Sequence, residues 1–558
     1  MATKRLLSGN EAIARGAWEA GVSVGCGYPG TPSTEILEAL FTYDDVYCEW
    51  SVNEKVALEV GLGASLAGAR ALVTMKHVGV NVAADPLFTA AYTGVEAGLV
   101  IITADDPSMH SSQNEQDNRH YAIAAKIPMF EPADAAEARE FAKAAFELSE
   151  DFDTPVFLRT TTRLSHSKSV VLVPDEPGAG REQRPAPAGF TKNPAKYVMI
   201  PGNARGRRVA LEQRMQRLSE LVETHPANRV EEGRGDVGII TAGVPYTYVK
   251  EVLPEASVLR LGIVHPLPRR LIEDFAARHK TVYVVEELDP VIETQLRAWG
   301  IDVIGKEVFP AIGEFSADVL RAALGLEPAA PPPVSAVPVP PRPPGLCPGC
   351  PHSPVYDALR DAGMVVSGDI GCYSLGVLPP YNALDTLVDM GASLTMAHGM
   401  DAALRDVPDR PKIAAVIGDS TFAHSGLTGL LNAIWNKRGG LYIVLDNGTT
   451  AMTGMQPNPM SGLRIGHEES PAVDYVLLAR AFGLPAENVR AVDAHDRAAV
   501  DAAITELAEQ PGIRLLAVIG MCVIEAKELR GLGMLEERKE ARTVHLPLTT
   551  RPGVAARV

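Results

Sequence analysis

Residues 412–436, KIAAVIGDSTFAHSGLTGLLNAIWN, have the pattern of a buried strand, a tight turn and a following helix. Gly418 in the turn allows the backbone to approach a ligand closely. Asp419 places a carboxylate at the end of the strand, where the first N–H groups of the helix favour an anion. A second apolar run, LYIVLDN at 441–447, ends at Asn447. If the two strands are parallel neighbours, Asp419 and Asn447 face each other at the carboxyl edge of the sheet.

This pair of side chains suits a hard cation. A carboxylate, an amide oxygen and a turn carbonyl form part of an octahedron of oxygen ligands, which Mg²⁺ accepts when phosphate oxygens complete it. The alternative interpretation is that Gly418-Asp419 is ordinary turn chemistry after a strand. The position of Asn447 at the end of the next strand favours the magnesium site.

The rest of the chain repeats the alternation of short apolar strands and helices. Such alternation predicts doubly wound parallel sheets of the α/β class, covered by helices on both faces. Strands are expected at 71–75, 98–103, 155–160, 236–243, 258–262, 281–287, 364–369, 412–419, 441–447 and 513–520, and a helix at 135–150. Prolines at 328–345 and a Pro/Gly-rich stretch near 173–192 divide the chain. We therefore expect three domains, a linker and an arm, at 1–190, 191–327, 328–345, 346–525 and 526–558.

Composition excludes several classes of protein. The 558 residues are 46% hydrophobic and 22% charged, which is incompatible with global disorder. Lys+Arg 52 against Asp+Glu 69 gives a net charge of −17, a poor match to nucleic acid or to an anionic membrane. The sequence contains neither an apolar run of membrane-spanning length nor a signal peptide. We expect a soluble, cytoplasmic protein that binds neither nucleic acid nor membrane.

Four of the six cysteines have a distinctive placement. Cys347 and Cys350 form a C-x₂-C pair directly after the linker, whereas Cys372 and Cys522 each follow a predicted strand. Both strand ends approach the edge that carries Asp419, so four thiolates could meet there and bind one [4Fe–4S] cluster. A four-thiolate zinc site would use the same ligands and remains the structural alternative. The remaining two, Cys26 and Cys48, fall outside this set.

The Gly418-Asp419-Ser420 triplet, with Asn447 nearly thirty residues later, resembles the thiamine diphosphate motif. The resemblance implies that Asp419, Asn447 and the backbone carbonyl of Thr449 bind the Mg²⁺ that holds the diphosphate. The family usually has glycine as the third residue of the triplet, where this chain has the small residue Ser420. Because serine is small, we interpret this difference as a modest departure from the motif.

Upstream motifs resemble those of the 2-oxoacid:ferredoxin oxidoreductases. Glu54, in SVNEKVALEVGLGASLAG, matches the family glutamate that contacts N1′ of the aminopyrimidine. Glu59, one turn further on, is the rival candidate for this role. The ordinary alternative is that Glu54 is a solvated glutamate in the first turn of a helix. The loop GYPGTPSTEI resembles the family loop in which a threonine, here Thr31, meets the substrate. Arg119 is a candidate for the arginine that pairs with the substrate carboxylate, a task that suits a bidentate guanidinium.

Long segments resemble the large, alpha-type subunit of indolepyruvate:ferredoxin oxidoreductase. They include LLSGNEAIARGAWEAGV, DDPSMHSSQNEQDNR, CPGCPH and GDIGCYSLG. The resemblance implies a pyrimidine-type thiamine domain at 1–190, a transketolase C-terminal-like middle domain and a diphosphate-type domain at 346–525. It also implies that four cysteines in this order hold the cluster. The family usually ends in a ferredoxin-like module with two further cysteine runs, whereas no cysteine follows Cys522 here.

The activity implied is oxidative decarboxylation of an arylpyruvate such as indolepyruvate to an acyl-CoA, with coenzyme A as co-substrate. Implied partners are a smaller beta-type subunit and ferredoxin or another electron acceptor, in a homodimer of large subunits or a heterotetramer. Two alternatives remain open. One is a non-oxidative thiamine-dependent decarboxylase or carboligase, and the other is a zinc-stapled subunit without catalytic activity.

Overall fold

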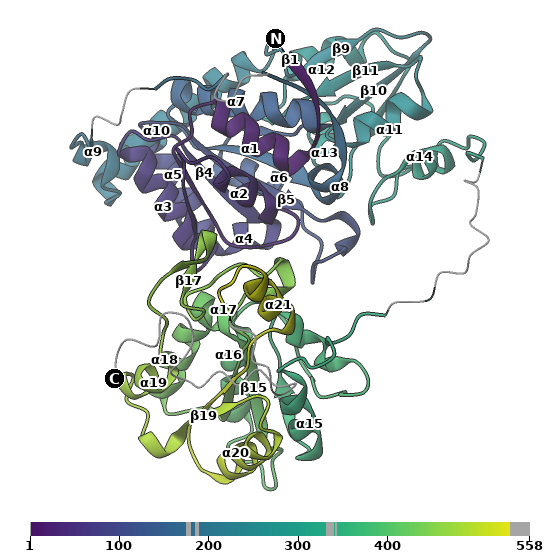
Figure 1. The fold of residues 1–558 in the computed structure, drawn as a ribbon. Coiled ribbons are helices and arrows are strands. Elements are labelled where there is room, and N and C mark those ends of the chain that lie inside the picture. Colours follow the sequence, from purple (N-terminus) through teal and green to yellow (C-terminus); the bar gives the residue numbers. More distant parts are fainter. Residues whose placement is uncertain (1, 175–179, 185–188, 331–339, 341–342, 536–558) are drawn as a thin grey trace. The chain divides into compact units, whose positions relative to one another are not determined.

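Two α/β units, within residues 1–335 and 336–558, make up the computed structural model (Figure 1). The structure describes residues 2–174, 180–184, 189–330, 340 and 343–535. Much of the expected proline linker at 328–345, and most of the expected arm at 526–558, lie outside the described residues. The domain boundaries therefore stay predictions.

The first unit is built on a seven-stranded sheet of order β12-β6-β7-β5-β4-β2-β3. Every neighbouring pair is parallel except β12 with β6, which is antiparallel. Its strands are β2 (Val24–Gly27), β3 (Tyr47–Trp50), β4 (Ala71–Lys76), β5 (Leu99–Asp105), β6 (Met129–Phe130), β7 (Val156–Thr161) and β12 (Ile263–His265). An antiparallel pair, β1 (Ala2–Ser8) with β8 (Lys168–Pro174), forms a separate ribbon.

The helices of this sheet follow from apolar spacing and capping. In α7 (Ala135–Phe152) the buried residues Ala138, Phe141, Ala142 and Phe146 recur at helical spacing, and the Asp134 side chain caps the first turn. This agrees with the helix predicted at 135–150. The other helices are α1 (Gly9–Glu19), α2 (Thr34–Phe41), α3 (Glu54–Leu66), α4 (His77–Val82), α5 (Ala84–Thr93), α6 (Arg119–Ala125) and α8 (Thr162–His166).

A second sheet of the same unit has the order β13-β10-β11-β9, with only β9 antiparallel. Its strands are β9 (Arg229–Glu231), β10 (Val237–Ala242), β11 (Ser257–Leu261) and β13 (Thr281–Val285). Its helices are α9 (Pro194–Tyr197), α10 (Pro201–Leu221), α11 (Pro245–Val252), α12 (Arg269–Ala276), α13 (Val291–Ala298) and α14 (Ala317–Ala323). Directly after β11 the chain enters β12, which joins the first sheet, so the segments expected as separate domains share one sheet edge.

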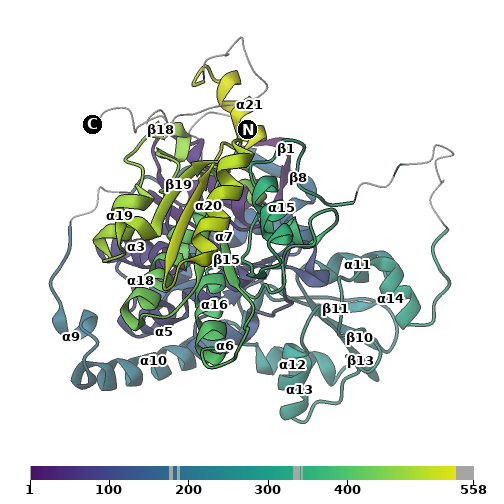
Figure 2. The ribbon, with the colours of Figure 1, turned by 90° about the horizontal axis from the view of Figure 1, so that it is seen from below.

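The second unit is a doubly wound parallel sheet of order β14-β15-β16-β20-β19. Figure 2 labels two of its strands, β15 and β19, together with the helices around the sheet. Alternate residues of each strand point to opposite faces, so each face carries its own apolar core. The strands are β14 (Val365–Ser367), β15 (Ile413–Gly418), β16 (Leu441–Asp446), β19 (Val489–Asp493) and β20 (Arg514–Ile519). Helices α15 (Ser353–Asp361) and α20 (Arg497–Glu509) cover one face; α16 (Ala392–Ala403), α18 (Leu427–Asn436) and α19 (Tyr475–Ala481) cover the other.

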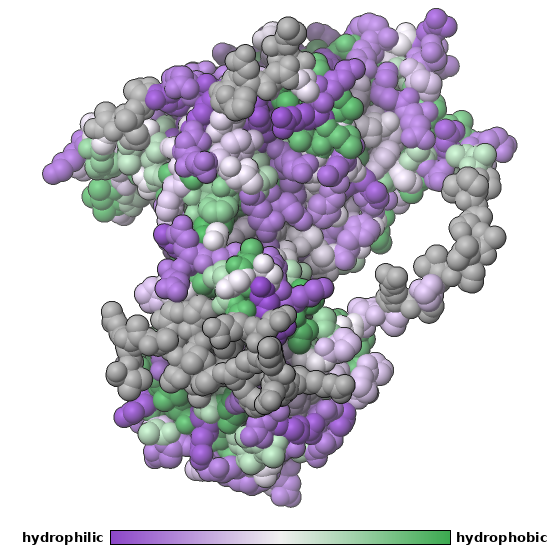
Figure 3. Space-filling view, in the orientation of Figure 1, coloured by the Kyte–Doolittle hydropathy of each residue, from purple (hydrophilic) through white to green (hydrophobic). Residues whose placement is uncertain are grey.

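The predicted fold class is confirmed, since parallel sheets with helices on both faces form in both units. The antiparallel edge strands β9 and β12 were not predicted, because each has only three residues and little periodicity. None of the helices in the described part of the chain is long and apolar enough to cross a membrane. Hydrophilic side chains cover most of the first unit's visible face in Figure 3.

Candidate active site

The carboxyl edge of the second unit's sheet gathers the predicted magnesium ligands. Strands β15 and β16 are parallel neighbours, with Gly418 opposite Leu445. Asp419 and Asn447 follow these two strand ends directly, as the sequence predicts. Both side chains are buried, and so is Thr449. Three oxygen donors of the kind that Mg²⁺ prefers therefore lie on adjacent turns of one sheet edge.

The loop after β16 returns to the Asp419 turn. Asn458 Nδ2 donates to Asp419 Oδ2 at 3.3 Å, and Thr450 Oγ1 donates to Ser420 Oγ at 2.9 Å. Asn447 Oδ1 accepts from the Thr449 N–H at 3.1 Å, which holds the turn tight. Asn458 was not predicted as a site residue, and its only local signal is the Asn-Pro turn in which it stands.

An aromatic ring packs against the backbone at Gly418. A methyl group at Gly418 would lie 2.5 Å from Cε1 of Tyr373, so the glycine makes room for this ring. The Tyr373 hydroxyl donates to the Ile370 carbonyl at 2.8 Å and lies 3.3 Å from Thr421 Oγ1. In the structure the glycine therefore fixes the segment that carries the neighbouring Cys372.

The cysteine segments come to the same edge. The N–H of Cys522, which precedes α21 (Val523–Gly531), donates to the Asn447 carbonyl at 2.9 Å. A methyl group at Gly520 would lie 2.8 Å from Pro351 Cβ, so the Cys347–Cys350 loop packs on the end of β20. Cys372 begins the short 3₁₀ helix Cys372–Val377 after β14. The predicted convergence of all three cysteine segments on one sheet edge agrees with these contacts.

The thiols also influence one another's ionisation. Burial raises the pKa of Cys350 to about 12, and the thiols of Cys372, Cys347 and Cys522 add to the shift. Burial raises the pKa of Cys372 to about 11, with contributions from Cys522, Cys347 and Asp419. In the part of the chain that the structure describes, no three His, Cys, Asp or Glu side chains are arranged to hold a metal ion. The cluster and magnesium ligand sets therefore stay predictions, although the donor types fit both groups.

His352 connects the cysteine loop with Asn447. Its Nε2 lies 3.3 Å from Asn447 Nδ2, and the ring packs edge-on against Tyr373. Burial lowers the pKa of His352 to about 4, so the ring is neutral at physiological pH. Since Nδ2 can only donate, Nε2 accepts and the ring proton resides on Nδ1. This contact turns the amide oxygen of Asn447 away from the histidine.

In the first unit, Glu54 is the first residue of α3, whose N-terminus Asn53 caps. The Glu54 side chain is 5% exposed and lies over α4, because a methyl group at Gly79 would stand 2.7 Å from its Oε1. The rival Glu59 is 46% exposed and forms a surface ion pair with Lys55. Burial therefore distinguishes Glu54 from Glu59 and from an ordinary solvated glutamate.

The Thr31 loop lies beside an unpredicted lysine. Ser111 Oγ donates to the Thr31 carbonyl at 3.3 Å, and Lys76 Nζ donates to the Ser111 carbonyl at 2.7 Å. Burial lowers the pKa of Lys76 to about 8. Lys76 ends strand β4, and a polar residue at that place in an apolar strand was the available sequence signal.

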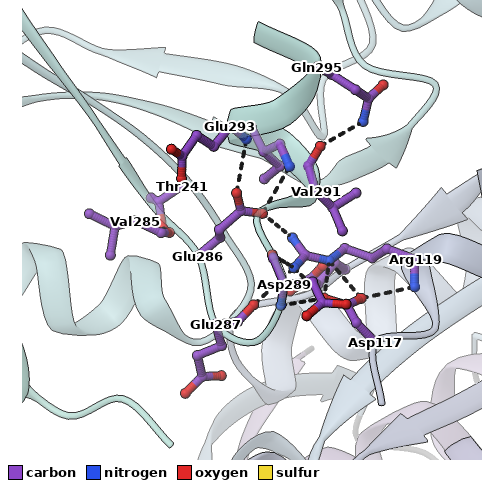
Figure 4. A network of polar contacts seen from close by, with 12 residues as sticks. Asp117, Arg119, Thr241, Val285, Glu286, Glu287, Asp289, Val291, Glu293 and Gln295 are labelled. Atoms are coloured by element: carbon purple, nitrogen blue, oxygen red, sulfur yellow. Dashed lines mark hydrogen bonds and ion pairs between the residues drawn. The ribbon is translucent and has the colours of Figure 1, made fainter. Parts of the chain in front are cut away.

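Arg119 lies in an internal network of ion pairs (Figure 4). Its guanidinium donates to both carboxylate oxygens of Asp117, to Glu286 Oε2 at 2.6 Å, and to the carbonyls of Glu287 and Asp289 at 2.9 Å. The side chain is 1% exposed. The structure therefore gives Arg119 different partners from the substrate carboxylate that the resemblance implies. Its partners join the two sheets of the first unit.

Comparisons with known proteins agree with this organisation. Residues 15–231 match the family "Pyruvate flavodoxin/ferredoxin oxidoreductase, thiamine diP-bdg", and residues 369–518 match "Thiamine pyrophosphate enzyme, C-terminal TPP binding domain". The indolepyruvate oxidoreductase subunit IorA of Archaeoglobus fulgidus is 45% identical, over 86% of this chain and 81% of its own. That of Methanothermobacter thermautotrophicus is 42% identical, over 95% of this chain and 89% of its own.

The chain belongs to the IorA family of indolepyruvate oxidoreductase subunits. It is thus a subunit of an oxidoreductase with thiamine-binding domains. A solved 2-oxoglutarate:ferredoxin oxidoreductase from Magnetococcus marinus, with 2-oxoglutarate, coenzyme A and succinyl-CoA bound, has a TM-score of 0.48 at 17% identity. It covers 58% of this IorA-family chain and 65% of that chain.

Replacing Arg119 by methionine tests its structural role. Arg119→Met leaves Asp117 and Glu286 buried without their cation, so we expect a loss of about 3–5 kcal/mol in the free energy of unfolding. Denaturant unfolding monitored by circular dichroism measures this loss. Arg163→Met, which removes a half-exposed pair with Glu314, is the control and should cost less than about 1 kcal/mol. Equal stability of Arg119→Met and wild type would contradict the role.

The same network predicts a dependence of stability on pH. Burial raises the pKa of Glu287 from 4.5 to about 7, so the folded protein holds a proton that the unfolded chain releases. Stability therefore falls as pH rises through this interval, by up to about 3 kcal/mol. Glu287→Gln keeps an acceptor for the Phe315 N–H and should flatten the decline, measured as thermal midpoints at the two ends of the interval. The exposed Glu327→Gln should leave the decline unchanged; identical slopes for all three proteins would refute the prediction.

Proposed function

We propose that this chain is the thiamine diphosphate-dependent subunit of a 2-oxoacid:ferredoxin oxidoreductase that acts on an arylpyruvate such as indolepyruvate. In the proposed reaction the carboxyl carbon leaves as CO₂ and the acyl group passes to the thiol of coenzyme A. The released electron pair passes one electron at a time through a [4Fe–4S] cluster to ferredoxin or another acceptor. The names of the IorA relatives, which call them subunits of an indolepyruvate oxidoreductase, support this substrate class and a partner subunit. We propose that this partner is the smaller, beta-type subunit.

One observation carries the proposal. The Cys522 N–H donates to the Asn447 carbonyl at 2.9 Å, so the residue proposed as a cluster ligand and the residue proposed as a magnesium ligand are hydrogen-bonded through the backbone. An enzyme that only decarboxylates has no need of thiolates at this edge. A zinc-stapled binding subunit has no need of the Asp419 and Asn447 oxygens.

The roles of the chain's residues follow from their chemistry. Asp419, Asn447 and the Thr449 carbonyl would hold Mg²⁺, with Gly418 and Ser420 forming the turn around the diphosphate. Glu54 would hold a proton at N1′ of the aminopyrimidine, and Thr31 would contact the substrate. Cys347, Cys350, Cys372 and Cys522 would ligate the cluster. Thiamine diphosphate, when bound, supplies the electron sink for loss of CO₂.

Metal and cofactor analysis separates the three candidate functions. The protein is purified anaerobically with its partner subunit, and iron, zinc and released thiamine diphosphate are measured. Iron together with thiamine diphosphate is the expected result. Thiamine diphosphate without iron would overturn the oxidative reaction in favour of a lyase, and zinc without thiamine diphosphate would overturn catalysis altogether.

Substitution of Glu54 tests the cofactor-activating role. Glu54→Gln removes the ionisable proton, so turnover of indolepyruvate should fall by roughly 10²–10⁴-fold, the usual contribution of a positioned acid or base. Bound thiamine diphosphate, measured after acid release, should remain at the wild-type level. The surface variant Glu59→Gln serves as the control with full turnover, and full turnover of Glu54→Gln would remove Glu54 from the mechanism.

Substitution of Cys372 tests the cluster. Cys372→Ala deletes one of four thiolate ligands, so the bound iron and the visible absorbance of the anaerobically purified protein should be lost. Cys48→Ala, which removes a buried thiol of the first unit, should leave both unchanged. Unchanged iron and absorbance in Cys372→Ala would remove this residue from the ligand set.

A further inference from the structure

Lys76 is a buried cation at a place where parallel sheets bind ligands. It is the last residue of β4, so it stands at the carboxyl end of a central strand. Its side chain is 9% exposed. Nζ donates to the Ser111 carbonyl at 2.7 Å and lies 3.2 Å from Ser111 Oγ. An ammonium has three N–H donors, and among the described residues none accepts from the third.

The charge of Lys76 is poorly compensated within the chain. Among the described residues, the carboxylate paired with it is Asp106, whose Oδ2 is 4.0 Å from Nζ, beyond hydrogen-bonding distance. That carboxylate is engaged elsewhere: it accepts from the Ser111 N–H at 2.9 Å, from Ser112 Oγ at 2.5 Å and from Thr162 Oγ1 at 2.6 Å. A buried ammonium without a close anion is costly, and an anionic ligand group would relieve that cost.

The ammonium also lies beside the Thr31 loop. The Ser111 segment touches both, since its hydroxyl donates to the Thr31 carbonyl and its carbonyl accepts from Lys76. A methyl group at Gly30 would stand 3.0 Å from Lys76 Cβ, so the loop packs closely on this side chain. The loop that is expected to contact the substrate and the Lys76 ammonium therefore lie side by side.

Arg119, the predicted partner of the substrate carboxylate, is less suited than Lys76 to bind a ligand carboxylate. Asp117, Glu286 and two carbonyls already occupy its guanidinium. To bind Arg119, a substrate carboxylate would have to displace buried anionic partners. At Lys76 it would instead supply the close anionic partner that the ammonium lacks.

We propose that Lys76 is the substrate-positioning residue of this chain, and that its ammonium binds the carboxylate of the 2-oxo acid. The inference rests on the proposed function and assigns its carboxylate-binding group. The contact is made to the carboxylate that is lost as neutral CO₂, so it stabilises the bound substrate more than the transition state. Removal of the ammonium therefore raises KM more than it lowers kcat.

The first measurement is steady-state kinetics of the holoenzyme with its partner subunit. Lys76→Met should raise KM for indolepyruvate roughly 10- to 100-fold, the effect of losing a hydrogen bond between charged groups, while kcat changes by less than about threefold. Lys76→Arg, which keeps the charge, should recover part of the loss. Lys168→Met, at an exposed lysine of β8, is the control with unchanged KM.

The second measurement asks whether Lys76 recognises negative charge. Indole-3-propionate and its neutral amide have the same shape apart from the carboxylate, and their binding to the holoenzyme is measured by calorimetry without turnover. Wild type should prefer the acid roughly 10- to 100-fold, and Lys76→Met should bind acid and amide alike. Lys76→Gln replaces Lys76→Met if the latter does not fold, as judged by circular dichroism.

Two results would overturn the assignment. One is a wild type that does not prefer the acid; the other is an acid preference retained in Lys76→Met or Lys76→Gln. Failure of the proposed function looks different, because the wild-type protein then lacks iron or thiamine diphosphate, or does not oxidise indolepyruvate. A wild type that turns over indolepyruvate, with an acid preference independent of residue 76, refutes the role of Lys76 alone.

Discussion

The parallel register of β15, β16 and β20 is the constraint on which the second unit's site depends. The register pairs Gly418 with Leu445 and Asp446 with Ile519, so three strands end at nearly the same level. Backbone bonds then continue past the strands, from the Gly520 N–H to the Asp446 carbonyl and from the Cys522 N–H to the Asn447 carbonyl. A shift of one residue in β20 would turn every side chain of that strand to the opposite face and break both bonds.

The first unit depends on buried charge in a comparable way. Arg159 donates to Asp105 at 2.7 Å and pairs with Glu131 at 2.6 Å, next to the Arg119 network. Breaking such pairs is costly because it leaves a charge buried without compensation. The ion pairs therefore connect the ends of β5, β6 and β13. The Asp106–Ser112 segment, which contacts Lys76, follows directly after β5.

Local signals were sufficient for most of the fold and for one half of the site. Strand and turn patterns correctly indicated the ends of β15 and β16, because Gly-Asp and Asp-Asn act within a few residues. Contacts between residues far apart in the sequence could not be predicted from such local patterns. Arg119 meets Glu286 across 167 positions, and no pattern around Arg119 distinguishes such a pair from a ligand contact. Asn458 reaches Asp419 by a loop whose path depends on packing.

Burial alone does not distinguish a structural cation from one that binds a ligand. The two differ in how many of their N–H groups already donate to acceptors of the same chain. The Arg119 guanidinium is surrounded by carboxylates and carbonyls of its own chain, so it strengthens the fold and offers little to a ligand. Among the described residues, the Lys76 ammonium donates to one serine, and the carboxylate paired with it, that of Asp106, accepts from four other donors. Such an arrangement favours a bound anion, because the ligand supplies the negative charge that the fold does not place beside the ammonium. The sequence alone does not separate the two kinds of cation, because the hydrogen-bond partners of Arg119 include Glu286, which is 167 positions away.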